Sequence, residues 1–188
     1  MRYIIAALGG ILIIFLIISL LFHGNNKQVE GNKTVAQLVD YANKNSSVSL
    51  TTYGELVGNQ ERRAIRVTVT PNERRLEVLS GYDESVLSTQ TYENTQSAYA
   101  NFLSALGALG FDKSRKSTIS DPRGVCPTGN RYVYDLSEGG KDKSNLWSNS
   151  CDNTGTFAGK GATTRTLFKF QIPDYNKQVQ SVRLYPTS

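Results

Sequence analysis

The side chains that could carry out chemistry in this chain are few and far apart. Its single histidine, His23, directly follows a long apolar run. A Ser-His-Asp or Cys-His site needs a histidine beside the nucleophile, so His23 is badly placed for one. No Ser-x-x-Lys pattern opens a predicted helix. We therefore expect a protein that is not an enzyme, with no catalytic residue, metal or cofactor. An envelope enzyme with an unrecognised site is the alternative.

The two cysteines, Cys126 and Cys151, suit a structural bond better than a metal site. Structural zinc takes four ligands, and His23 lies far away in the sequence. A disulfide between the two cysteines would close a loop of about 26 residues and stabilise the fold by roughly 3–4 kcal/mol. The sequence predicts this disulfide. Free buried thiols are the alternative.

Basic residues gather in two stretches that could contact an anionic polymer. The first stretch lies on a predicted β-hairpin and consists of Arg62, Arg66 and Arg75. The second lies in a predicted loop and consists of Lys113, Arg115 and Lys116. Lys160 is a further basic residue downstream. Glutamates 61, 73 and 77 lie among the first set and dilute its charge. Solvated strand faces are the alternative interpretation. Without Arg2, 20 Lys and Arg stand against 16 Asp and Glu, a net charge of +4 that argues against a nucleic-acid partner.

Residues 155–161, GTFAGKG, are similar to a phosphate-binding loop but lack the Ser or Thr that follows its lysine. If a helix follows, its first N–H groups and Lys160 could hold an anion. An ordinary glycine loop beside the cysteines is the alternative.

Three aromatic residues fall on a predicted strand pair beside the cysteines: Tyr132, Tyr134 and Trp147. If they are exposed together, they would make a recognition surface. If they are buried, they belong to the core.

The elements that position these residues can be predicted from periodicity. Alternating apolar residues predict strands at 47–56, 62–70, 76–80, 84–92, 131–136, 146–150 and 178–184. Helical spacing predicts a helix that Thr34 caps, a second over 94–109, and a third that begins at Thr163 or Thr164 and ends before Pro173. The last helix is expected to bury Leu167, Phe168 and Phe170. Together these elements predict an α+β domain, with about three helices on an antiparallel sheet.

The chain begins with an uncharged apolar run over residues 3–22, YIIAALGGILIIFLIISLLF. As a helix it would be about 30 Å long, the thickness of the hydrocarbon core of a bilayer. It is too long for a signal-peptide core, and no clean small-x-small cleavage site follows it. We therefore expect residues 1–23 to be an uncleaved signal-anchor in contact with membrane lipid, 24–32 a linker, and 33–188 a domain outside the cytoplasm. A cleaved signal peptide is the alternative.

Motifs in the second half are similar to those of small membrane-anchored proteins from Saccharibacteria-type bacteria. They are CPTGNRYVY (126–134), LWSNSC (146–151), GTF (155–157) and LFKFQIPDY (167–175), within about residues 120–176. This resemblance implies a bacterial single-pass membrane protein and supplies no catalytic residue.

The expected function is binding or assembly outside the cell membrane, with another envelope protein or an anionic polymer as the partner. A pilin-like or secretion-system subunit that assembles through its N-terminal helix is the alternative. Type IV pilins share the apolar helix, the α+β head and the disulfide. They carry a glutamate early in the mature helix, whereas no charge follows Arg2 within this span.

Overall fold

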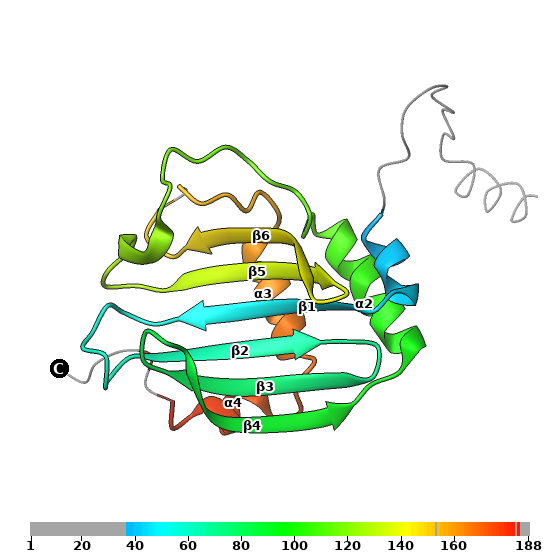
Figure 1. The fold of residues 1–188 in the computed structure, drawn as a ribbon, viewed down its shortest axis with the longest axis horizontal. Coiled ribbons are helices and arrows are strands. Elements are labelled where there is room, and N and C mark those ends of the chain that lie inside the picture. The colour runs from blue at the N-terminus through cyan, green and yellow to red at the C-terminus, as the bar shows by residue number, and fades with distance from the viewer. Residues whose placement is uncertain (1–36, 153, 183, 185–188) are drawn as a thin grey trace, which may run out of the picture. The chain divides into compact units, whose positions relative to one another are not determined.

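A six-stranded antiparallel sheet forms the framework of the domain, as Figure 1 shows. The computed structural model describes residues 37–152, 154–182 and 184. The strand order is β4-β3-β2-β1-β5-β6. The strands are β1 (Ser46–Tyr53), β2 (Arg63–Val69), β3 (Glu73–Ser80), β4 (Ser85–Glu93), β5 (Arg131–Glu138) and β6 (Lys141–Asn149). The α+β class and the antiparallel meander that the sequence predicts are confirmed.

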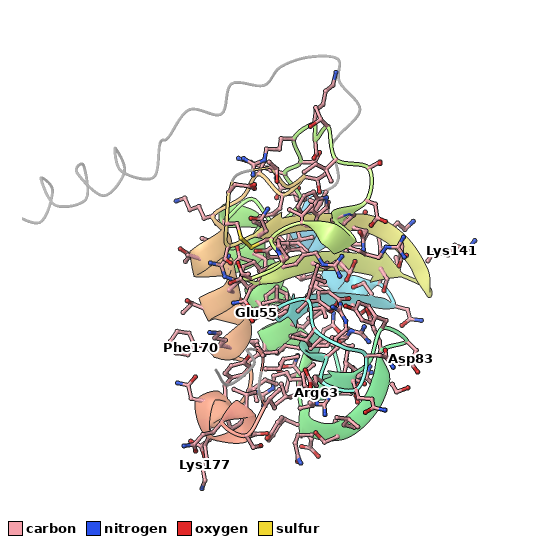
Figure 2. All side chains as sticks on the ribbon, turned by 90° about the vertical axis from the view of Figure 1, so that its left-hand side faces the viewer. Glu55, Arg63, Asp83, Lys141, Phe170 and Lys177 are labelled. Atoms are coloured by element: carbon pink, nitrogen blue, oxygen red, sulfur yellow. A yellow bond between two sulfur atoms is a disulfide. The ribbon has the colours of Figure 1, made fainter. Side chains whose placement is uncertain are left out.

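Helices cover one face of this sheet, and Figures 1 and 2 show α3 and α4 on the same side. The helical elements are the 3-10 turns η1 (Leu38–Asn43) and η2 (Pro122–Gly124), and the helices α2 (Gln96–Ala108), α3 (Gly161–Lys169) and α4 (Tyr175–Val179). The Thr95 side chain accepts a hydrogen bond from the Ala98 N–H at 3.2 Å and caps α2. Thr34, the predicted cap of the first helix, lies outside the described residues, which begin at Gln37.

The main core lies between the sheet and the helices. Every second residue of β1 points into this core, beside its partners on β2 and β5. Val48 lies between Val69 and Leu136, and Leu50 lies between Val67 and Tyr134. Five aromatic rings pack together in this core: Phe102, Phe111, Tyr134, Phe157 and Phe168. The ring centre of Phe168 in α3 lies 5.2 Å from that of Phe102 and 5.9 Å from that of Phe111. Phe168 has no exposed surface, so α3 is held to the sheet by a ring that solvent does not reach.

The opposite face of the sheet, here called the polar face, carries hydroxyls and charges, among them Ser49, Thr51, Arg66, Arg75 and Asp135. Ser49 donates a hydrogen bond to Asp135 at 3.3 Å across β1 and β5. Arg66 donates one from Nε to Thr51 at 3.2 Å. Even on this face, Thr51 is only 1% exposed, so the polar side chains are packed against each other.

The C-terminal region differs from the prediction in its last element, in the start of α3 and in the burial of Phe170. The last predicted strand, 178–184, is wrong: Gln178 and Val179 end helix α4, and Val182 donates a turn hydrogen bond to Val179. The side chains of Tyr175, Val179 and Val182 pack on the core at helical spacing.

Helix α3 begins at Gly161, before the predicted threonine cap. The Lys160 N–H is held by the carbonyl of Leu109 at 2.9 Å, which fixes where the chain turns into the helix. Phe168 is buried as predicted, but Phe170 is 78% exposed because the chain leaves the helix at Lys169.

Cys126 and Cys151 form a disulfide, with their Cα atoms 5.6 Å apart. It joins the loop before β5 to the end of β6, so it closes one end of this strand pair.

The predicted membrane span, 3–22, lies outside the described residues. Within residues 37–152, 154–182 and 184, the structure contains no helix with the length and apolar character of a membrane span.

Candidate functional site

Two tyrosines and two arginines stack on each other at the end of the sheet where β1 ends and β2 and β5 begin. The guanidinium carbon of Arg62 lies 4.2 Å from the ring centre of Tyr82 and 5.1 Å from that of Tyr53. The guanidinium carbon of Arg131 lies 4.2 Å from the Tyr53 ring centre. We call these four residues the arginine–tyrosine stack. Figure 2 looks onto this end of the sheet, near the labelled Arg63 and Asp83.

Local sequence explains how the stack is built. Tyr53 is the last residue of β1, and Arg131 is paired with it as the first residue of β5. Arg62 is held by its backbone, because its N–H donates to Gly58 and its carbonyl accepts from Gly81. Gly81 has φ +73, which lets the chain turn tightly after β3 and place Tyr82 beside Arg62.

Tyr82 is fixed by the neighbouring loop. Its N–H donates to the side chain of Asn59 at 2.7 Å, and its hydroxyl donates to the carbonyl of Val57 at 3.1 Å. The ring is still 52% exposed. The stack therefore reaches from the interior of the domain, at Tyr53, to its surface, at Tyr82.

Glu84 brings a carboxylate onto the polar face beside this stack. Tyr53 donates its hydroxyl hydrogen to Glu84 Oε1 at 2.5 Å, and Arg66 forms an ion pair with the other carboxylate oxygen. Glu84 has φ +57, an unusual backbone conformation for a residue with a side chain. Burial, and then the hydrogen bond to Glu84, raise the pKa of Tyr53 to about 12, so the phenol stays neutral at physiological pH.

The charges of the site do not balance. Arg62, Arg66 and Arg131 bring three positive charges, and Glu84 is already bound to Arg66. Burial lowers the pKa of the Arg131 guanidinium, and the nearby charge of Arg62 lowers it further. Asp121 also lies near enough to act on Arg131, but its carboxylate is held by Arg123 in an ion pair at 2.7 Å.

Arg62 is the least expected member of the stack. It is 6% exposed, although arginine is rarely buried without a partner. Its Nε is shut off from solvent and has no hydrogen-bond partner within the described part of the chain. Unsatisfied buried donors are uncommon in native proteins, and this atom has no accessible surface through which a ligand could reach it. The stacking on Tyr53 and Tyr82 is what holds the guanidinium of Arg62 in place.

The three arginines of the first predicted basic stretch lie in different surroundings. Arg66 and Arg75 lie on the polar face together, as their alternation predicts. Arg75, however, is neutralised by Glu73 at 3.3 Å and Glu77 at 3.6 Å, so it adds little positive charge. Arg62 and Arg66 thus belong to the candidate site, and Arg75 does not.

The second basic stretch lies elsewhere, along the β6 edge of the sheet. Lys113, Arg115 and Lys116 are all exposed, and the chain there runs beside 154–158 through a bridge between Ser114 and Phe157. Arg115 donates from Nε to the carbonyl of Gly155 at 2.7 Å. Strands β1 and β5 separate this edge from β2, so the two basic stretches do not form one site.

The loop that is similar to a phosphate-binding loop packs on the end of α2. A Cβ atom on Gly159 would lie 2.4 Å from the carbonyl oxygen of Gly110, so the glycine permits this close approach. Lys160 is exposed at the start of α3. The geometry accounts for these glycines through packing.

The three aromatic residues of the β5–β6 pair do not form an exposed recognition surface. Tyr132, Tyr134 and Trp147 are at most 9% exposed. Tyr134 stacks on Phe157 with ring centres 3.9 Å apart, inside the main core. Trp147 pairs with Val133, at the opposite strand parity from Tyr134, so it lies on the other face of the sheet. The alternative interpretation, that these rings are core, holds.

A second candidate is a polar cavity of about 630 Å³ at the other end of the sheet. Its lining is rich in amides and hydroxyls, including Asn43, Asn45, Ser46, Asn72 and Gln96. Lys44 is the ionisable residue in this lining. The Nζ atom of Lys44 forms an ion pair with Glu138 Oε1 at 3.2 Å. Within the described residues, no group of His, Cys, Asp and Glu could hold a metal ion.

Sequence reasoning identified Arg62 and Arg66 but missed Tyr53, Tyr82 and Arg131. An arginine at the start of a strand usually extends into solvent, so the sequence offered no reason to select Arg131. The available signal was Gly81-Tyr82, where a turn glycine adjoins an aromatic residue. Arg131 had no such signal, because its partner Tyr53 lies on another strand. No protein-family model matches this chain, and a search of curated proteins finds no significant match.

Proposed function

We propose that this protein is a single-pass membrane protein whose α+β domain lies outside the cytoplasm and binds an anionic group of an envelope partner through the arginine–tyrosine stack. The observation that carries the proposal is that the guanidiniums of Arg62 and Arg131 are both held on the Tyr53 ring, while the nearby carboxylate of Glu84 is already bound to Arg66. Arg131 adds a second guanidinium on the same tyrosine.

The geometry suits carboxylate or phosphate ligands. A guanidinium that stacks on a ring uses its flat face, and its N–H donors point outward in the plane of the group. These donors match the paired oxygens of a carboxylate or a phosphate. Two stacked guanidiniums beside one tyrosine are therefore already held in place, which reduces the entropy lost on binding.

The disulfide and the apolar N-terminal run support the proposed location. Disulfides persist in oxidising compartments outside the cytoplasm, and Cys126 and Cys151 are bonded. The run over residues 3–22 has the length of a membrane span.

Replacing Arg131 with glutamine is expected to weaken binding of polyglutamate or polyphosphate by about tenfold to a hundredfold. This range follows from the 1.5–3 kcal/mol that hydrogen bonds to charged groups contribute. Titration of the full chain in detergent with each labelled polymer measures the effect and separates carboxylate from phosphate ligands.

The matched control is Lys141→Gln, which removes the same charge from the exposed turn at the other end of β6. Figure 2 shows Lys141 projecting away from the domain. If both variants weaken binding equally, the effect is one of net charge and the stack is not the site.

Protease added to intact cells is expected to digest the domain while leaving cytoplasmic proteins whole. The reason is the proposed topology, which leaves residues 33–188 outside the membrane. Immunodetection of a C-terminal tag before and after lysis measures this. A tag that survives until the cells are lysed would show the opposite orientation.

A further inference from the structure

The two edges of the sheet differ in a way that bears on self-association. Along β6, the adjoining chain covers the half near Asn149: Phe157 donates its N–H to the Trp147 carbonyl at 2.9 Å, and Trp147 donates to Thr156 at 3.0 Å. The other half of β6 carries Lys141, Asp142 and Lys143. Covering and charge are the usual protections of an edge strand.

Among the described residues, the β4 edge lacks both of these protections. Residues 85–91 are all exposed, including Val86 and Leu87 at 53% and 57%. Residues 85–92 contain no charged side chain and no proline. On its inner side β4 is paired with β3 from Glu73–Glu93 to Ser80–Ser85, with Leu87 left out of the pairing. Its outer backbone groups therefore form a row that another strand can bind.

Two features limit the regular part of this row. Val78 pairs with Ser88 and Leu79 with Val86, so Leu87 is an extra residue and forms a bulge. At the other end, Arg74 donates from Nε and Nη2 to the carbonyl of Glu93 at 3.2 and 3.0 Å. The regular open segment thus runs over 88–92, and its midpoint is Gln90.

We propose that a second copy of this chain binds here, so that the two β4 strands pair antiparallel about a twofold axis at Gln90. In this register Gln90 faces Gln90 of the other copy, and each Thr89 faces a Thr91. Thr–Thr pairs and amide hydrogen bonds stabilise such cross-strand contacts. Residues that face each other have the same parity, so each side chain stays on its own face of the joined sheet.

Charge also favours a second copy in this register. Glu93 is the charged residue of β4. Antiparallel pairing about Gln90 places the two Glu93 residues at opposite ends of the joint, about 20 Å apart at 3.3–3.4 Å per residue. No like charges are opposed, and the arginine–tyrosine stack is not part of the joint. The inference therefore stands independently of the proposed anion site.

A cysteine at the twofold axis tests the register directly. Opposed residues on paired strands have Cβ atoms about 4.5–5.5 Å apart, close enough for Gln90→Cys to bond to its own copy after mild oxidation. The two native cysteines are already bonded, and the described residues contain no free thiol. The full-length Gln90→Cys chain in its membrane should run as a dimer on a non-reducing gel.

The control is Ser104→Cys, an exposed position on α2 that lies outside β4. It measures dimers formed by random collision. If Gln90→Cys gives no more dimer than Ser104→Cys, or bonds to a different protein, the proposal is overturned.

Charge pairs provide a second test that introduces no thiol. Gln90→Lys and Gln90→Glu each oppose like charges and should weaken the dimer about fivefold, whereas a mixture of the two should restore it. Analytical ultracentrifugation in detergent measures the three cases. Equal association of the two variants and of their mixture would refute pairing at Gln90. Because Gln90 is exposed, neither change should alter folding, and the melting temperature checks this.

Discussion

Replacing Phe168 with alanine is expected to reduce the free energy of unfolding by about 3–5 kcal/mol. The ring has no exposed surface and meets Phe102 edge-to-face at 5.2 Å. Its removal leaves a cavity between α3 and the sheet, and rigid strands on one side prevent the site from collapsing. Since domains of this kind are usually stable by 5–15 kcal/mol, the loss takes up much of the total.

Phe170→Ala supplies the matched control, with the same change two residues later. Phe170 is 78% exposed, and Figure 2 shows it projecting from the helix side of the domain. Its replacement should change stability by no more than about 0.5 kcal/mol. Urea unfolding of both variants, followed by far-UV circular dichroism, measures the difference. Similar losses in the two variants would mean that α3 is rotated relative to the arrangement described here.

Replacing both Cys126 and Cys151 with serine is expected to lower the melting temperature by roughly 7–14 °C. The disulfide closes a loop of about 26 residues, for which chain entropy gives about 3.5 kcal/mol. A change of 1 kcal/mol shifts the melting temperature of a domain of this size by about 2–4 °C. The measurement is calorimetry of the variant and the native chain without reductant.

Reductant provides the internal control for this second prediction. It should lower the melting temperature of the native chain toward that of the double-serine variant and leave the variant unchanged. A native chain that melts at the same temperature with and without reductant would contradict a stabilising bond. Because β5 begins at Arg131, soon after Cys126, the reduced protein should also bind anionic probes less well.

Periodicity predicted β1, β2 and β5 well because core-facing residues recur at every second position of these strands. The alternation of Arg63, Ile65, Val67 and Val69 assigns the core face of β2, and this assignment holds in the structure. Alternation is a local property, however, and it does not identify a strand's neighbours. The pairing of β1 with β5 joins residues about 80 positions apart, such as Thr52 and Tyr132, and no local pattern contains it.

The candidate site was only partly predictable for the same reason. Arg62 and Arg66 could be placed on one face from their spacing. Tyr53 and Arg131 meet only because β1 and β5 are neighbours, and Tyr82 reaches Arg62 through a loop contact with Asn59. The error at 178–184 has a different cause. Tyr175, Val179 and Val182 follow a helical period, which was mistaken for strand alternation.

The difference between the two edges of the sheet also limits how many copies of the chain could join edge to edge. A sheet with two open edges can add strands at both sides without end, which is how fibrils lengthen. Here the chain that runs beside Trp147, and the lysines at the start of β6, close one side to further strands. Pairing through β4 would use the other side, so each molecule could join one partner and then stop. This arrangement would favour a finite pair over a polymer, even where many copies are crowded together.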